Sequence, residues 1–170
     1  MNLKLLLIKA LLLMRFYSLV GWILYYFSKI EGEKKVNQVR ILYLSKPVFN
    51  EDVRALKNFS IKSLYIRFPK VLLYPILKHF ISNADELNDM NYHVKVGETS
   101  EVKALRNFWK KVIPILQKKL KFDAILSGNF VYTSQQEFFR VANQKNIPIF
   151  ILYKEGMFPS DRNDHIKKVF

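Results

Sequence analysis

Two polar segments, each directly after a strongly apolar run, carry the residues of this chain that could bind or transform a substrate. Residues 127–133 read SGNFVYT and follow FDAIL, whereas residues 154–157 read KEGM and follow IPIFILY. Glu155 could accept hydrogen bonds from ligand hydroxyl groups or act as a general base on an acceptor hydroxyl. The predicted substrate-binding residues of the two segments are Ser127, Gly128, Asn129, Tyr132, Lys154 and Gly156.

A purely structural explanation of both segments stays open at this point. Thr133 or Ser134 would then cap a helix, because a hydroxyl at that position accepts a backbone N–H. The glycines of the two segments would form turns, and the adjacent Lys154 and Glu155 would be solvated. The residue types alone do not separate this explanation from a binding site.

The elements that would position these segments belong to an α/β fold. Short apolar or β-branched runs predict strands at residues 39–45, 61–68, 122–127 and 147–153. Amphipathic segments predict helices at residues 51–58, 70–82, 100–120 and 134–145. Continuous apolar strands separated by helices are typical of a Rossmann-like parallel sheet with helices on both faces. In such sheets, ligands bind beyond the carboxyl ends of the strands.

Several kinds of chemistry are excluded or unsupported by the composition. The chain has no Cys, so disulfides, cysteine nucleophiles and Cys-based metal sites are absent. Its three His residues are scattered, and no metal site is predicted. No G-x-G-x-x-G, Walker A or G-x-S-x-G motif occurs, so nothing marks a nucleotide-binding loop or a serine hydrolase.

The charge is strongly positive and unevenly distributed. The net charge is +14 over 170 residues, and residues 53–84 and 102–122 contain no acid. Such surfaces attract nucleic acid, anionic lipid or phosphorylated substrates. A nucleic-acid partner is disfavoured, because no nucleic-acid-binding motif is visible and the chain begins with about thirty largely apolar residues.

That N-terminal segment, residues 1–30, also contains no acid. Placed on one continuous helix, Lys4, Arg15 and Lys29 fall on the same side as Trp22, which favours a helix lying in the headgroup plane of a membrane. A membrane-spanning helix, a cleaved signal peptide and a buried core helix remain alternatives. The predicted membrane contacts are Lys4, Arg15, Trp22, Lys29, Arg67 and Lys70.

The predicted organisation along the chain follows from these features. Residues 1–30 form the membrane-associated helix and residues 31–38 a polar linker. Residues 39–160 form the α/β domain, and residues 161–170 form a polar tail.

The segment FDAILSGNFVYTSQQEFFRVANQKNIPIFILYKEG resembles the end of the amino-terminal Rossmann-like domain of GT-B glycosyltransferases, especially bacterial ones of capsule and surface-polysaccharide synthesis. The residues that carry the resemblance are Asp123, Ile125, Ser127, Gly128, Ile147, Pro148, Glu155 and Gly156. The loop at residues 45–50 departs from the family pattern, because it lacks the glycines often found there.

The resemblance implies an acceptor-side domain of a glycosyltransferase at the cytoplasmic face of the cell membrane. The expected partners are membrane lipid and a lipid-linked or polysaccharide acceptor. The chain resembles one of the two GT-B domains, so the sugar nucleotide donor is expected on another domain or on a second Rossmann-like subunit, and no cofactor is assigned to this chain. The alternative is a non-enzymatic, basic scaffold that binds anionic lipid at the membrane surface.

Overall fold

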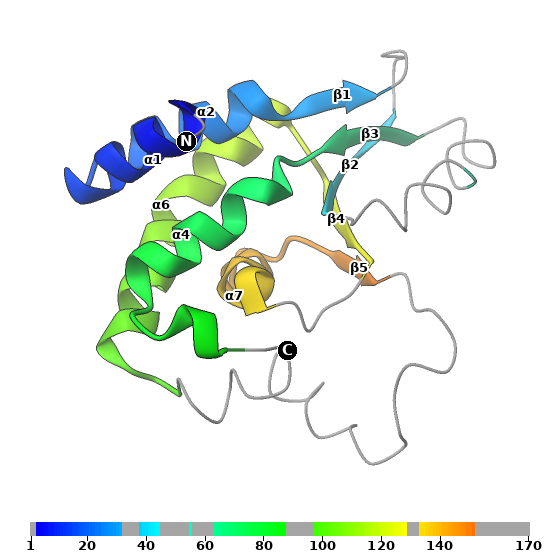
Figure 1. Cartoon of the computed structure of the whole chain (residues 1–170). Helices are drawn as coiled ribbons and strands as arrows, with labels where there is room; N and C mark the ends of the chain where they lie inside the picture. The colour runs from blue at the N-terminus through cyan, green and yellow to red at the C-terminus, as the bar shows by residue number, and fades with distance from the viewer. Residues whose placement is uncertain are drawn as a thin grey trace.

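A five-stranded sheet with the order β1-β3-β2-β4-β5 forms the centre of the protein. The computed structural model describes residues 3–31, 38–44, 55, 63–87, 97–128 and 133–151. The strands are β1 (Lys29–Glu31), β2 (Val39–Leu44), β3 (Ser63–Arg67), β4 (Ala124–Ser127) and β5 (Ile149–Ile151). β1 runs antiparallel to β3, whereas β3, β2, β4 and β5 run parallel. The predicted α/β class with a mainly parallel sheet is confirmed (Figure 1).

The central strands bury side chains on both of their faces. Leu42, Ile66 and Ile125 belong to the main core cluster, which also contains the helices. Tyr43 and Tyr65 are buried too, but they form a separate cluster with Leu126. Because successive side chains of a strand point to opposite faces, the two clusters lie on opposite sides of the sheet. Burial on both sides explains why these strands read as nearly continuous apolar runs.

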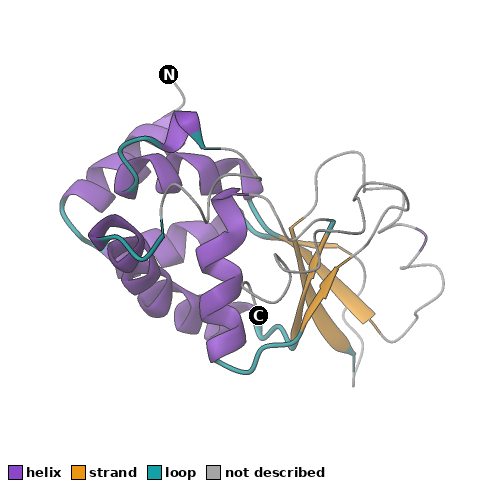
Figure 2. Cartoon of the chain, turned by 90° about the horizontal axis from the view of Figure 1, so that it is seen from below, coloured by secondary structure: helices purple, strands orange, loops and turns teal. Residues whose placement is uncertain are grey.

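The helices with described bounds gather on one face of the sheet, as Figure 2 shows. They are α1 (Leu3–Leu13), α2 (Tyr17–Phe27), α4 (Leu73–Phe80), α6 (Ser100–Leu120) and α7 (Gln136–Gln144). The predicted arrangement with helices on both faces is therefore not found among the described residues. The helix predicted at residues 51–58 lies outside them, apart from Ala55.

The single helix predicted over residues 1–30 is wrong, because the structure has two helices and a strand there. α1 ends at Leu13, α2 begins at Tyr17, and residues 29–31 form the edge strand β1. The backbone of Arg15 is left-handed, with φ 58°. Phe16 N–H donates to the carbonyl of Leu11, and Arg15 N–H to that of Leu12. These two bonds form a Schellman turn, which closes α1 without the usual glycine.

The inner sides of α1 and α2 are part of the protein core. Ile8 and Leu12 of α1 and Val20 and Leu24 of α2 are all fully buried. Gly21 lets α2 approach α6 closely, since a Cβ at that position would lie 3.3 Å from Ile115 Cδ1. Among the described residues, no helix has both the length and the apolar character needed to cross a bilayer.

Candidate functional site

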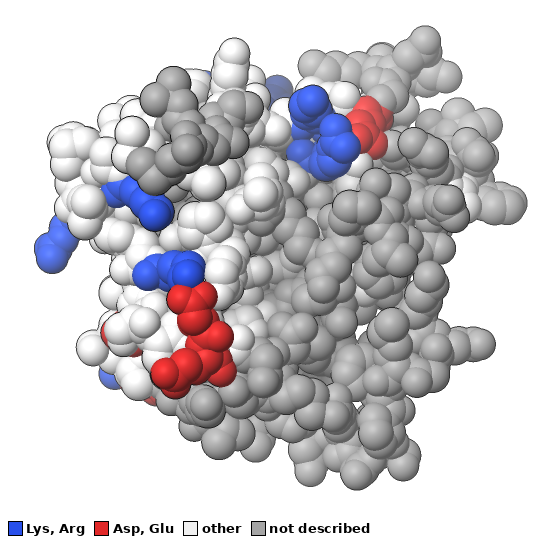
Figure 3. Space-filling model, in the orientation of Figure 1, with Lys and Arg blue, Asp and Glu red and all other residues white. Residues whose placement is uncertain are grey.

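The outer face of the α1–α2 pair carries most of the large apolar side chains that are exposed among the described residues. Leu13 is 75 % exposed and Tyr26 is 79 % exposed. The other members of this surface on the two helices and the turn between them are Leu6, Leu7, Met14, Phe16, Leu19 and Trp22. We call this set the outer face. In Figure 3 the region of α1 carries mostly uncharged surface, interrupted by isolated Lys and Arg residues. Contiguous apolar surface is typical of sites where proteins contact membranes or other macromolecules.

Lysines of α6 flank the outer face. The Lys119 ammonium lies 4.0 Å from the centroid of the Trp22 ring, and that of Lys111 lies 5.3 Å from the centroid of Tyr17. Both lysines are exposed, and a cation over an aromatic ring is held there by the ring quadrupole. The packing of α2 against α6 thus brings together two acid-free stretches of the sequence, residues 1–30 and 102–122.

The predicted membrane contacts do not share one helical face. Trp22 belongs to the outer face, Arg15 lies in the turn before α2, and Lys29 is exposed in β1. Arg67 of β3 pairs with Glu31 of β1, with 3.2 Å between Nε and Oε1. The side chains of Lys4 and Lys70 lie outside the described residues. The break at residues 14–16 separates the basic residues that a single continuous helix would have aligned.

The sequence interpretation did not single out Leu13, Phe16 or Tyr26. No sequence signal separates them from the buried residues, because both helices are apolar on nearly every side and only the packing shows that Ile8, Leu12, Val20 and Leu24 are buried.

The strand-end site predicted from the sequence is described only in part. Ser127, at the end of β4, lies beside Leu44, at the end of β2. Its hydroxyl is 3.4 Å from the Leu44 carbonyl oxygen and 3.1 Å from Gln135 Oε1, and all three residues are fully buried. Gly128 is buried next to it. Asn129, Tyr132, Lys154, Glu155 and Gly156 lie outside the described residues.

The strand order places the end of β4 at a point where ligands bind in related sheets. β3 lies on one side of β2, and β4, the next parallel strand along the chain, lies on the other. The order therefore reverses between β2 and β4, and ligands of open α/β sheets bind at the carboxyl ends of the strands at such a point. Ser127 lies at this point, but its buried hydroxyl contacts Leu44 and Gln135 of the protein itself. These contacts fit a structural role for Ser127 at the end of β4.

A buried carboxylate connects α6 and α7 near this site. Glu137 Oε2 accepts a bond of 2.7 Å from Arg106 Nε, and Glu137 Oε1 lies 3.8 Å from Arg140 Nε. Glu98 accepts two further bonds of 2.8 Å from Arg106. These bonds hold the pKa of the Glu98 carboxyl below its usual value. The network ties the helices together and offers no free catalytic group.

The described residues contain no group of three or more His, Cys, Asp or Glu that could hold a metal ion. Comparison with known proteins adds no family: neither a family model, nor a curated protein, nor a solved structure was found to match the chain.

Proposed function

We propose that the protein docks on the cytoplasmic face of the cell membrane through the outer face of α1 and α2. The observation that carries this proposal is the adjacency of that exposed apolar face to the lysines of α6, with Lys119 at 4.0 Å from the Trp22 ring. Apolar and aromatic side chains enter the boundary between headgroups and acyl chains, while basic residues remain at the lipid phosphates.

Approximate magnitudes support docking without a spanning helix. Full burial of one large apolar side chain contributes about 1.5–3 kcal/mol, so the half-exposed residues of the outer face contribute less each but add together. A basic residue close to an anionic leaflet contributes about 1 kcal/mol. Several such terms together are enough for reversible binding to a membrane surface.

Within this setting, we propose the acceptor-side role in a glycosyltransferase of surface-polysaccharide synthesis. Support comes from the resemblance carried by Asp123, Ser127 and Glu155 and from the reversal of strand order beside Ser127. The outer face would hold the domain next to a lipid-linked acceptor. The sugar nucleotide donor would bind to a second Rossmann-like domain or subunit, and Glu155 would accept the proton of the acceptor hydroxyl.

Docking can be tested through Trp22, because the chain has only two Trp residues and the other, Trp109, is 1 % exposed. We expect vesicles of phosphatidylcholine and phosphatidylglycerol to shift the emission of the full chain to the blue, as Trp22 leaves water. The Trp22→Phe variant should lose the shift. The double variant Leu13→Ser/Tyr26→Ser should bind more weakly than Phe150→Ser, which alters an exposed residue on the far edge strand β5. Equal binding by both variants would exclude the outer face.

The enzymatic role needs a separate test. Transfer of sugar to a lipid-linked acceptor should require the full chain together with a donor-binding subunit, and it should fall strongly in Glu155→Ala and Asn129→Ala. If both variants keep full transfer activity, the site assignment is wrong. If vesicle binding is normal but no donor-binding partner restores transfer, the scaffold alternative is favoured.

A further inference from the structure

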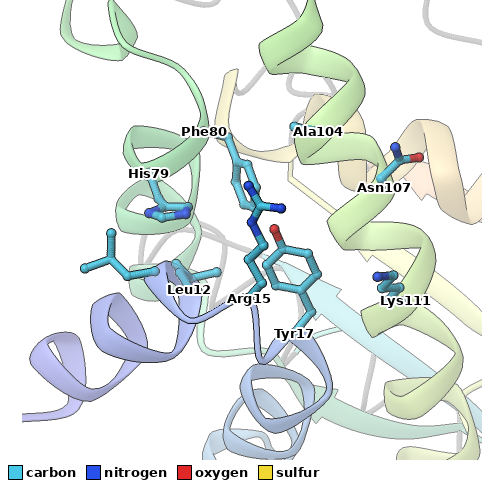
Figure 4. A pocket seen from close by; sticks show the side chains of 9 residues that line it. Leu12, Arg15, Tyr17, His79, Phe80, Ala104, Asn107 and Lys111 are labelled. Carbon is cyan, nitrogen blue, oxygen red and sulfur yellow. The ribbon is translucent and has the colours of Figure 1, made fainter.

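A cavity opens where the turn between α1 and α2 meets α4 and α6. Its volume is about 540 Å³. The polar side chains that line it are Arg15, Tyr17, His79, Asn107 and Lys111. Leu12 and Phe80 supply apolar wall, so the cavity has a cationic part and an apolar part. Figure 4 shows the Arg15 guanidinium between the α4 side chains and the Tyr17 hydroxyl, with Lys111 approaching from α6.

The cavity gathers positive charge that the described protein does not neutralise. No acid is among the described residues that line it. Neither Arg15 nor Lys111 forms an ion pair with an acid in the described part of the chain, and Lys111 instead lies over the Tyr17 ring. Both cations line the same cavity, so an anion bound in it would be stabilised by both.

The backbone at Arg15 holds this side chain at the cavity wall. Its φ of 58° places a non-glycine residue in the left-handed region. This conformation closes α1, as that of Lys121 closes α6, and it costs an L-residue free energy relative to glycine. Here glycine would close the same turn at lower cost, yet the position carries a guanidinium that lines the cavity.

The start of α2 adds to the positive field. Tyr17 is both the first residue of α2 and part of the cavity wall. α2 has neither a side-chain cap nor an acid in its first turn, so no charge of that turn offsets the positive end of its dipole, although Leu19 and Val20 N–H already donate to the Phe16 carbonyl.

We propose that this cavity binds the phosphate group of a membrane lipid, with the start of the lipid's apolar tail against Leu12 and Phe80. A guanidinium and an ammonium are the usual protein partners of phosphate. Leu13 lines the cavity and also belongs to the outer face, so a lipid could occupy the cavity while its chains remain in the membrane. The inference rests on the proposed membrane docking and deepens it by naming the headgroup chemistry.

The test uses the full chain and dihexanoyl phosphatidic acid below its micelle concentration, measured by isothermal titration calorimetry. We expect saturable binding of one lipid per chain. Arg15→Gly and Lys111→Gln should each weaken it by about tenfold or more, because each removes charge-assisted hydrogen bonds to the phosphate. Lys110→Gln is the matched control, since Lys110 is exposed on the same helix but does not line the cavity. Its affinity should equal that of the unmodified chain.

Thermal unfolding separates a binding role of Arg15 from a structural one. Arg15→Gly should leave the midpoint unchanged or raise it, since glycine suits the left-handed turn. Loss of stability together with loss of binding would mean that the residue supports the fold, and the proposal would fail. Equally tight binding of inorganic phosphate would overturn the lipid in favour of a soluble anion.

The outcome is distinguishable from failure of the docking proposal. In one case vesicles still shift Trp22 emission, but the short-chain lipid does not bind or binds Arg15→Gly as tightly as the unmodified chain. Docking then stands and the cavity assignment is wrong. If vesicles do not bind but the short-chain lipid binds in an Arg15-dependent way, the cavity assignment stands and the outer face does not dock.

Discussion

At the scale of single residues, Arg106 shows where sequence periodicity stops being informative. It belongs to the acid-free stretch at residues 102–122, which lies largely in the helix predicted at residues 100–120, and the bases of an amphipathic helix usually face solvent. Instead it bonds to the buried Glu137 and to Glu98. Long side chains can bend around a helix toward a partner on another element, and the position of that partner depends on tertiary packing.

Replacing Arg106 should therefore destabilise the protein far more than a surface substitution. Arg106→Met removes the 2.7 Å partner of Glu137, which is only 2 % exposed, and leaves the longer contact of 3.8 Å with Arg140. Breaking a buried pair on one side costs about 3 kcal/mol or more, and we expect a loss of this size in urea unfolding. Lys103→Met, on the exposed side of the same helix, should change the unfolding free energy by about 0.5 kcal/mol or less. Similar effects of both variants would contradict the proposed role of the network.

His79 predicts a dependence of stability on pH. Partial burial lowers its pKa below the ordinary 6.5, so the folded state binds the proton less tightly than the unfolded state. The contribution of neutral His79 to stability is then full above pH 6.5 and is lost as the pH falls through the folded-state pKa. Urea unfolding between pH 7.5 and about 5 should show a smaller decline for His79→Gln than for the unmodified chain. Parallel curves for the two proteins would exclude this contribution.

At the scale of elements, the four parallel strands could be predicted from the sequence, whereas β1 could not. β2, β3 and β4 lie in apolar or β-branched runs, and burial on both of their faces leaves that pattern in the sequence. β5 lies in the equally apolar run IPIFILY, although Phe150 is exposed at the edge of the sheet. β1 has only three residues, KIE, and pairs antiparallel with β3 at the edge of the sheet. So short a strand carries no periodic signal, and its pairing with Arg67 depends on how the chain leaves α2.

The break between α1 and α2 was missed for a related reason. Residues 14–16 are Met, Arg and Phe. Because they include neither Pro nor Gly, no residue in this segment predicts the end of a helix. The turn forms because it lets both helices bury one side against α4 and α6. Tertiary packing thus offsets the cost of the left-handed Arg15.

This packing makes a direct prediction about the N-terminal pair. Leu24→Ala removes a fully buried side chain of α2, and we expect it to cost about 2–5 kcal/mol of unfolding free energy. Leu13→Ala truncates the same residue type at 75 % exposure and should change stability little. Chemical denaturation of the two variants measures the difference. A negligible effect of Leu24→Ala would mean that α2 is not part of the cooperative core, as a detachable membrane helix would require.

At the scale of the whole molecule, the uneven charge and the outer face together predict how salt affects membrane binding. Apolar insertion is not screened by salt, whereas attraction to an anionic leaflet is strongly screened when the Debye length falls to about 3 Å at 1 M salt. Binding to vesicles of phosphatidylcholine and phosphatidylglycerol should therefore weaken with salt but level off above zero. The residual affinity should match that for pure phosphatidylcholine at low salt, where only the apolar contribution acts. Lys119→Gln should lower affinity for anionic vesicles at low salt, because this lysine lies beside Trp22, and it should have little effect at high salt. Complete release at high salt would show that docking is electrostatic alone, and the exposed apolar side chains of α1 and α2 would then need a different partner.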